Sequence, residues 1–145
     1  DPDENRLAVA RQLGATDTVS ADPVETIMKL TDSEGVDVAM EAVGIPESFD
    51  TCQRILRPGG RLANIGVHGR SVEFRIEDLW IKNVTVRTGL VNTNTIPVLM
   101  RFLEAGGIEA KSLITHRFAL KEIEEAYDIF SRASSENAIK VLLSA

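Results

Sequence analysis

The feature that most constrains the fold is a repeated alternation of apolar β-type runs with helical runs between residues 17 and 91. The segments expected to form strands are 17–20, 36–43, 61–67 and 84–91, and each is followed by a turn or helix. The run at 36–43 is too apolar to leave one face in water, which is typical of parallel strands covered by helices on both faces. The repeating unit is strand, turn, helix, so the sequence predicts a doubly wound α/β fold.

The helices between these strands are expected from apolar spacing and from end signals. Residues 3–13 place apolar side chains at helical spacing, and Gly14 follows the last of them. Asp22 and Pro23 are typical of an N-cap and a first helical position, and they predict a second helix. Further helices are expected at 45–56 and 76–82, and Pro58-Gly59-Gly60 predicts a turn.

The alternation of strands and helices changes after residue 91, which indicates a domain boundary. A helix at 96–105 is followed by a β-like run at 112–118, a helix at 121–132 and a strand at 138–143. This order is α+β rather than α/β. We therefore expect residues 1–91 to form one domain and residues 92–145 to form a C-terminal segment that packs on a neighbouring domain.

Composition narrows the classes of partner. The chain has 145 residues, 43% of them hydrophobic, which is enough to fill a core. It carries 16 basic and 22 acidic residues, and the basic ones are scattered, so a nucleic-acid partner is not expected. No apolar run approaches the roughly 18 residues that span a bilayer, and no signal peptide opens the sequence. The expectation is a cytoplasmic protein without a membrane partner.

Residue types that bind metals or act in catalysis are few. The sequence holds one cysteine, Cys52, and two histidines, His68 and His116, without the spacing of zinc ligands, so no metal site and no catalytic residue are expected within it. Cys52 alone excludes an intrachain disulfide. His68 follows a strand tip and either lies near a bound cofactor or is an exposed loop histidine, which is the favoured interpretation. For His116 a structural role within a strand-like segment is favoured.

Four motifs together carry a resemblance to a known family: GVDVAMEAVG at 35–44, LRPGGRL at 56–62, IGV at 65–67 and LITH at 113–116. In order and spacing they resemble the C-terminal, coenzyme-binding portion of zinc-dependent medium-chain alcohol dehydrogenases. The family's catalytic domain and its G-x-G-x-x-G turn are not in this sequence. The resemblance implies a partial Rossmann-type doubly wound parallel sheet that lacks its first two strands, with an α+β C-terminal tail. The strand at 17–20 would then lie two strands from the strand at 36–43.

The resemblance also implies polar groups that bind the coenzyme. Asp1 matches the acidic residue whose carboxylate accepts hydrogen bonds from the adenosine ribose, which favours NAD over NADP. Arg6 matches a basic residue beside the same ribose, and Lys140 matches one that reaches the pyrophosphate. Without the family, Asp1 reads equally well as a helix-capping acid, Arg6 as a solvated helix residue and Lys140 as an outward-facing charge.

The tips of three strands are expected to hold the rest of the coenzyme, because open α/β sheets bind ligands at the carboxyl ends of their strands. By resemblance, Ile65 and Val67 pack near the nicotinamide, and backbone groups around Val67, Gly89 and Val91 hold its carboxamide. Taken alone, these valines are ordinary core residues. The full set of expected tip residues is Val43, Gly44, Ile65, Gly66, Val67, Gly89, Leu90 and Val91.

The resemblance implies the coenzyme-binding portion of an enzyme that oxidises short-chain alcohols to carbonyl compounds with NAD, with zinc bound by residues outside this chain. By itself the chain is expected to be inactive. The alternatives are a polyol or threonine dehydrogenase of the same family, or a non-catalytic fragment that acts only in oligomerisation. A homo-oligomer is expected through residues 84–91, whose apolar side chains are Val84, Val86, Leu90 and Val91.

Overall fold

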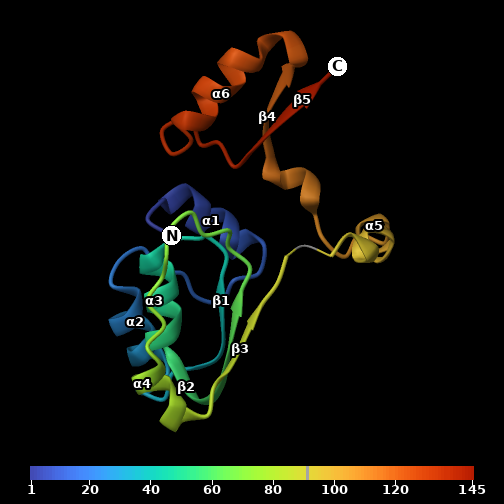
Figure 1. Cartoon of the computed structure of the whole chain (residues 1–145). Helices are drawn as coiled ribbons and strands as arrows, with labels where there is room; N and C mark the ends of the chain where they lie inside the picture. The colour runs from blue at the N-terminus through green and yellow to red at the C-terminus, as the bar shows by residue number, and fades with distance from the viewer. Residues whose placement is uncertain (91) are drawn as a thin grey trace. The chain divides into compact units, whose positions relative to one another are not determined.

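The computed structural model describes residues 1–90 and 92–145. They divide into two compact units, Asp22–Val91 and the pair of segments Asp1–Ala21 and Asn92–Ala145 (Figure 1). Residues 1–21 thus group with the C-terminal segment by their contacts. The expected division into domains at 1–91 and 92–145 remains a prediction.

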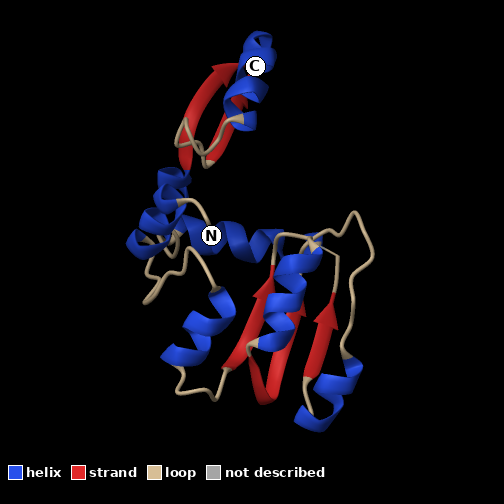
Figure 2. Cartoon of the chain, turned by 90° about the vertical axis from the view of Figure 1, so that its left-hand side faces the viewer, coloured by secondary structure: helices blue, strands red, loops and turns tan. Residues whose placement is uncertain are grey.

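The first unit is built on a three-stranded parallel sheet of β1 (Val36–Glu41), β2 (Leu56–Asn64) and β3 (Thr85–Thr88), in the order β1-β2-β3. Its helices are α2 (Pro23–Leu30), α3 (Pro46–Arg54), α4 (Ile76–Leu79) and the 3-10 turn η1 (Trp80–Lys82). Figure 2 shows the three arrows running the same way beside α3. The expected α/β class and the neighbouring order of these three strands are therefore confirmed.

The core of this unit lies between the sheet and α3. Phe49 and Cys52 of α3 pack with Leu56 and Leu62 of β2 and with Ala39 of β1. The buried Gln53 side chain donates to the Glu73 carbonyl at 3.0 Å and accepts from the Arg75 amide at 2.9 Å. Because both groups of its amide are satisfied, Gln53 fixes the connection that leads away from β2 at little cost.

The other side of β1 differs from the expectation. Val38 and Met40 are exposed, whereas Ala39 and Glu41 are buried. The run that looked too apolar for a wet face therefore has one here, because α3 packs on the opposite face of β1. Large exposed apolar side chains on a strand favour a covering partner.

The prediction of a strand at residues 17–20 is wrong. Among the described residues it joins neither sheet, and the carbonyl of Val19 instead accepts a hydrogen bond of 2.9 Å from the Asp1 amino group. A strand needs a neighbouring ladder to satisfy its backbone groups, and one such contact does not supply it.

The boundaries of the other strands also shift. Val36 lies opposite Leu56 and Val38 opposite Arg61, so the segment with Pro58, Gly59 and Gly60 forms a wide bulge inside β2 instead of a separate turn. β2 then ends at Asn64, and β3 ends at Thr88. Residues 65–67 and 89–90 consequently lie beyond the strands, as loops, instead of within them.

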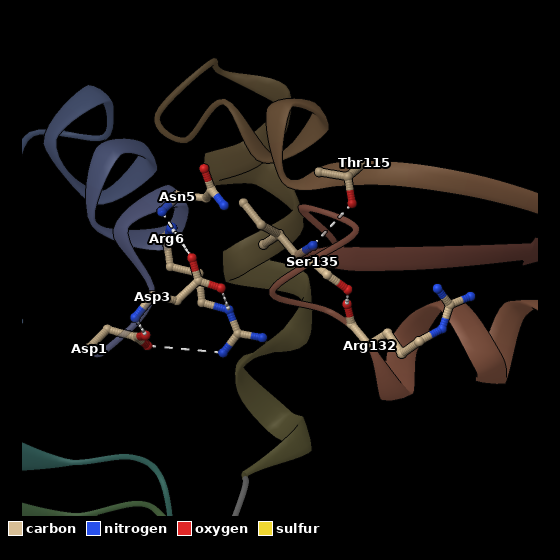
Figure 3. A network of polar contacts seen from close by, with 8 residues as sticks. Asp1, Asp3, Asn5, Arg6, Thr115, Arg132 and Ser135 are labelled. Carbon is tan, nitrogen blue, oxygen red and sulfur yellow. Dashed lines mark hydrogen bonds and ion pairs between the residues drawn. The ribbon is translucent and has the colours of Figure 1, made fainter.

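The second unit contains α1 (Glu4–Gln12), α5 (Ile96–Glu104), α6 (Ile123–Ser131) and a parallel pair of strands, β4 (Ile114–Ala119) and β5 (Lys140–Ser144). Short 3-10 turns lie at Thr93–Thr95, Ala110–Leu113 and Leu120–Glu122. The Thr115 hydroxyl accepts from the Ile139 amide at 3.0 Å, which joins the starts of the two strands (Figure 3). The predicted helices and strands of the tail are thus present within a few residues of their expected bounds.

Candidate functional site

The carboxyl ends of β1, β2 and β3 lie at one edge of the sheet, because the three strands are parallel. The segments that follow them present exposed apolar side chains. Val67 is 84% exposed and Leu90 is 89% exposed, and Val43 and Ile65 are also exposed. Val91 lies outside the described residues. Val43 and Val67 are therefore not the ordinary core residues that their type suggests.

Glu41 connects the carboxyl ends of β1 and β2 through its hydrogen bonds. It is the last residue of β1, and only 1% of its surface is exposed. Its Oε1 atom accepts hydrogen bonds from the Val43 amide at 2.9 Å, the Gly44 amide at 2.8 Å and the Ser48 hydroxyl at 2.5 Å. Its carbonyl oxygen accepts from the Ile65 and Gly66 amides at 2.8 and 3.1 Å.

The same two tips touch through their glycines. Gly44 has a φ of +88°, and a Cβ atom there would overlap the backbone of Val67. A Cβ atom at Gly66 would overlap the Glu41 carboxylate and the backbone of Gly44. Only glycine fits this approach, so the chain at residues 43–44 packs directly against the chain at residues 66–67.

His68 completes the arrangement. Its Nε2 atom lies 2.8 Å from Oδ1 of Asn64 and 3.3 Å from Oε2 of Glu41. Its ring packs edge-on against Phe49, with centroids 5.8 Å apart and an interplanar angle of 87°. The favoured expectation of an exposed loop histidine is therefore wrong, because 17% of the side chain is exposed.

Two titratable groups near this edge have pKa values that differ from their ordinary ones. Burial alone would raise the pKa of Glu41, but the hydrogen bonds from Ser48, Gly44 and Val43 and the charge of His68 together lower it. Glu41 is therefore a carboxylate at neutral pH. Burial, with a contribution from the charge of Glu41, raises the pKa of the Cys52 thiol to about 11, so the thiol stays protonated.

The polar residues expected around the adenosine belong to the second unit (Figure 3). Oδ1 of Asp1 accepts from the Asp3 amide at 2.9 Å, and Oδ2 lies 4.0 Å from Nη1 of Arg6. The residue that caps α1 is Asp3, which accepts from the amides of Asn5 and Arg6. Lys140 is exposed at the start of β5. The structure thus brings Asp1 and Arg6 together at the start of one helix.

Glu41 is the residue of this edge that sequence reasoning missed. A signal was present, since an acidic residue that ends a buried strand just before a glycine has to satisfy its charge nearby. Asn64, which ends β2 and donates from Nδ2 to the Gly66 carbonyl at 3.3 Å, carries a weaker signal of the same kind.

The chain as a whole matches a known family. A family model described as "Zinc-binding dehydrogenase" matches residues 1–105, which is most of the chain. The chain belongs to this family. The sequence resemblance to zinc-dependent alcohol dehydrogenases and the partial coenzyme-binding fold are thereby confirmed.

Individual relatives of this zinc-binding dehydrogenase chain are also dehydrogenases. The solved structure of zinc dependent alcohol dehydrogenase 2 from Streptococcus pneumonia is 51% identical, with a TM-score of 0.91 over 98% of this chain and 42% of that one. The sorbitol dehydrogenase of Arabidopsis thaliana is 36% identical over 98% of this chain and 41% of its own length. A structure of a putative zinc-binding dehydrogenase from Sinorhizobium meliloti, bound to NADP, is 28% identical, with a TM-score of 0.82 over 95% of this chain and 42% of that one. The chain therefore spans about two fifths of the length of these relatives.

The described side chains of this chain that could bind a metal do not form a site for the zinc of the family. Within residues 1–90 and 92–145, no three His, Cys, Asp or Glu side chains are grouped so that they could hold a metal ion. The Cys52 thiol is buried and protonated, and His68 already faces Asn64 and Glu41.

In the part of the chain that the structure describes, no helix has the length and apolar character to cross a membrane.

Proposed function

We propose that this zinc-binding dehydrogenase chain is the coenzyme-binding portion of an NAD-dependent alcohol dehydrogenase that acts on short-chain alcohols. The observation that carries the proposal is the row of exposed apolar side chains, Val43, Ile65, Val67 and Leu90, above a strand edge held by Glu41. A soluble protein rarely exposes such a group of apolar side chains without a ligand or partner.

The flat face of a nicotinamide ring suits this row of apolar side chains. Contact with the ring removes Ile65 and Val67 from water, which contributes about 25 cal/mol for each Å² of apolar surface buried. The apolar wall would turn one ring face toward the substrate and keep water away from it, and backbone groups at 67, 89 and 91 would bind the carboxamide. Bound NAD supplies the acceptor for the hydride that leaves the alcohol carbon.

The choice between NAD and NADP rests on Asp1. Its carboxylate would accept hydrogen bonds from the ribose hydroxyls of NAD and would repel the 2′-phosphate of NADP. Arg6, whose Nη1 atom lies 4.0 Å from Asp1, is the nearby cation that would attract that phosphate. We assign NAD because, by the sequence resemblance, Asp1 occupies the position of the acidic residue that binds the ribose. The relative from Sinorhizobium meliloti that binds NADP makes the comparison of the two coenzymes the natural test.

We assign the binding of the substrate's polar groups, and the binding of zinc, to residues outside this chain. The chain by itself is therefore proposed to be inactive. A polyol dehydrogenase is the second candidate, supported by the 36% identity to the sorbitol dehydrogenase of Arabidopsis thaliana. A threonine dehydrogenase belongs to the same group of alternatives. A role restricted to oligomerisation would leave the exposed tip residues without a ligand. We also assign the protein to the cytoplasm.

The test uses the full-length protein that carries this chain. Titration with NADH and NADPH, followed by fluorescence, is expected to give tighter binding of NADH. Turnover is then measured with ethanol, 2-propanol, sorbitol and threonine, with the 145-residue chain plus added zinc as the inactive comparison. Binding of neither coenzyme would refute the proposal, and turnover of sorbitol alone would select the polyol alternative.

A further inference from the structure

We infer that His68 is a positioning residue of the coenzyme site, which closes the loop at residues 64–68 and so sets where Ile65 and Val67 stand. This inference rests on the proposed coenzyme function. It concerns a side chain that has no place in the row of apolar tips, because only 17% of it is exposed and it points back under the strand ends.

The loop after β2 is held at both of its ends. At the first end, Asn64 donates from Nδ2 to the Gly66 carbonyl at 3.3 Å, and the Ile65 and Gly66 amides donate to the Glu41 carbonyl. At the second end the contact comes from His68, whose Nε2 atom lies 2.8 Å from Oδ1 of Asn64. Ile65 and Val67 stand between these two anchors with their side chains exposed.

The hydrogen-bonding partners determine which nitrogen of His68 carries a proton. Asn64 Oδ1 and Glu41 Oε2 both face Nε2, at 2.8 and 3.3 Å. Both are acceptors, since Glu41 is ionised and the Asn64 amide nitrogen already donates to Gly66. Nε2 therefore carries a hydrogen, which it donates to Asn64 Oδ1, and Glu41 Oε2 lies beside the same nitrogen.

Glu41 lies against this N–H group. Its Oε1 atom accepts three hydrogen bonds, whereas its buried Oε2 atom has no aligned hydrogen-bond donor among the described residues and has His68 Nε2 as a polar neighbour at 3.3 Å. Replacement of His68 by an apolar residue would remove this polar neighbour from a buried carboxylate oxygen, which favours movement of the loop toward water. The loop that moves is the one that presents Val67 and Ile65.

Two variants separate this role from simple packing. His68→Phe keeps a ring against Phe49 but removes the donor, whereas His68→Gln keeps an N–H donor and removes the ring. In the full-length protein, His68→Phe is expected to raise the dissociation constant for NADH about fivefold or more, as loss of a hydrogen bond worth about 1 kcal/mol predicts. His68→Gln is expected to stay within about threefold of the wild type, which corresponds to less than the loss of one hydrogen bond. The Tm of each variant is measured alongside.

Hydrogen exchange of the Ile65, Gly66 and Val67 amides gives a second reading that needs no coenzyme. Exchange in the free protein is expected to speed up in His68→Phe and to return toward wild type in His68→Gln. If the wild-type protein binds no NADH, the proposed function fails, and the exchange rates still decide the inference. Normal NADH binding and exchange in His68→Phe, or a His68→Gln variant as impaired as His68→Phe, would overturn it.

Discussion

Nε2 of His68 lies 3.3 Å from Oε2 of Glu41, and this contact joins the end of β1 to the loop that follows β2. Glu41 holds both strand tips: its carboxylate accepts from the amides of residues 43 and 44, and its backbone carbonyl accepts from the amides of residues 65 and 66. The apolar side chains above it keep a defined position while they remain exposed, which is the arrangement that a binding surface needs.

Replacement of Gly66 by alanine is expected to destabilise the sheet unit by about 1–3 kcal/mol, the usual effect of forcing extra atoms into a packed site. The new Cβ atom would overlap the Glu41 carboxylate and the Gly44 backbone. Gly89→Ala is the matched control, because a Cβ atom there meets nothing within 4 Å. Urea unfolding of both variants measures the difference, and equal stabilities would contradict the packing described here.

Stability is expected to fall with acid through Glu41. Its pKa in the folded protein lies below its ordinary value of 4.5, so the unfolded chain binds the proton more readily than the folded one. The stabilisation is therefore fully present above that ordinary value and is lost as the pH falls through the lowered pKa of the folded protein. Urea midpoints between about pH 3 and pH 6 measure it. Glu41→Gln should flatten this slope, whereas substitution of the exposed Glu34 by glutamine should leave it in place.

Cys52 is expected to resist thiol reagents in the folded protein. Its side chain is buried, and its pKa of about 11 keeps the reactive thiolate scarce at pH 8. The measurement is the release of the coloured thiolate from an aromatic disulfide reagent at pH 8, before and after addition of urea. Rapid reaction without urea would show that the packing of α3 on the sheet does not cover the thiol as described.

Replacement of Asp1 by glycine in the full-length enzyme is expected to relax the preference for NAD over NADP. The variant loses charge-assisted hydrogen bonds to the ribose worth roughly 1.5–3 kcal/mol together, so NAD binds more weakly. The change is measured as the ratio of kcat/KM for the two coenzymes. Equal efficiency with NAD and NADP before the substitution would refute the assignment of Asp1.

The free edge of β3 is expected to support self-association. Within the described residues β3 pairs with β2 on one side only, and a strand with an open edge can pair across a two-fold axis with its copy. Light scattering at micromolar concentration is expected to show at least a dimer. A clean monomer would mean that another element covers this edge, and the proposed oligomer through residues 84–91 would have to be abandoned.

Much of the fold could be predicted because it depends on local patterns. The helices α1 and α2 follow from apolar spacing, from Gly14 after α1 and from Pro23 at the start of α2, whereas Asp22 occupies the expected N-cap position of α2 without a side-chain capping bond. The strand at 17–20 failed because its own residues suit a strand but the described chain gives it no neighbour. The bulge around Pro58 and Gly60 was missed because it depends on the register against β1, which no local pattern specifies.

The sequence by itself determined the alternation of strands and helices, because burial and turn preferences depend on neighbouring residues, and the family resemblance supplied the neighbouring order of β1, β2 and β3. The tertiary structure decided where β2 and β3 end, because their ends depend on pairing. The tertiary structure alone decided what lies under those tips. Glu41 is far in sequence from Asn64 and His68, and it meets them because parallel strands bring their carboxyl ends to one edge. A charge can be buried there only when donors from several elements converge on it, and that convergence is a property of the folded chain.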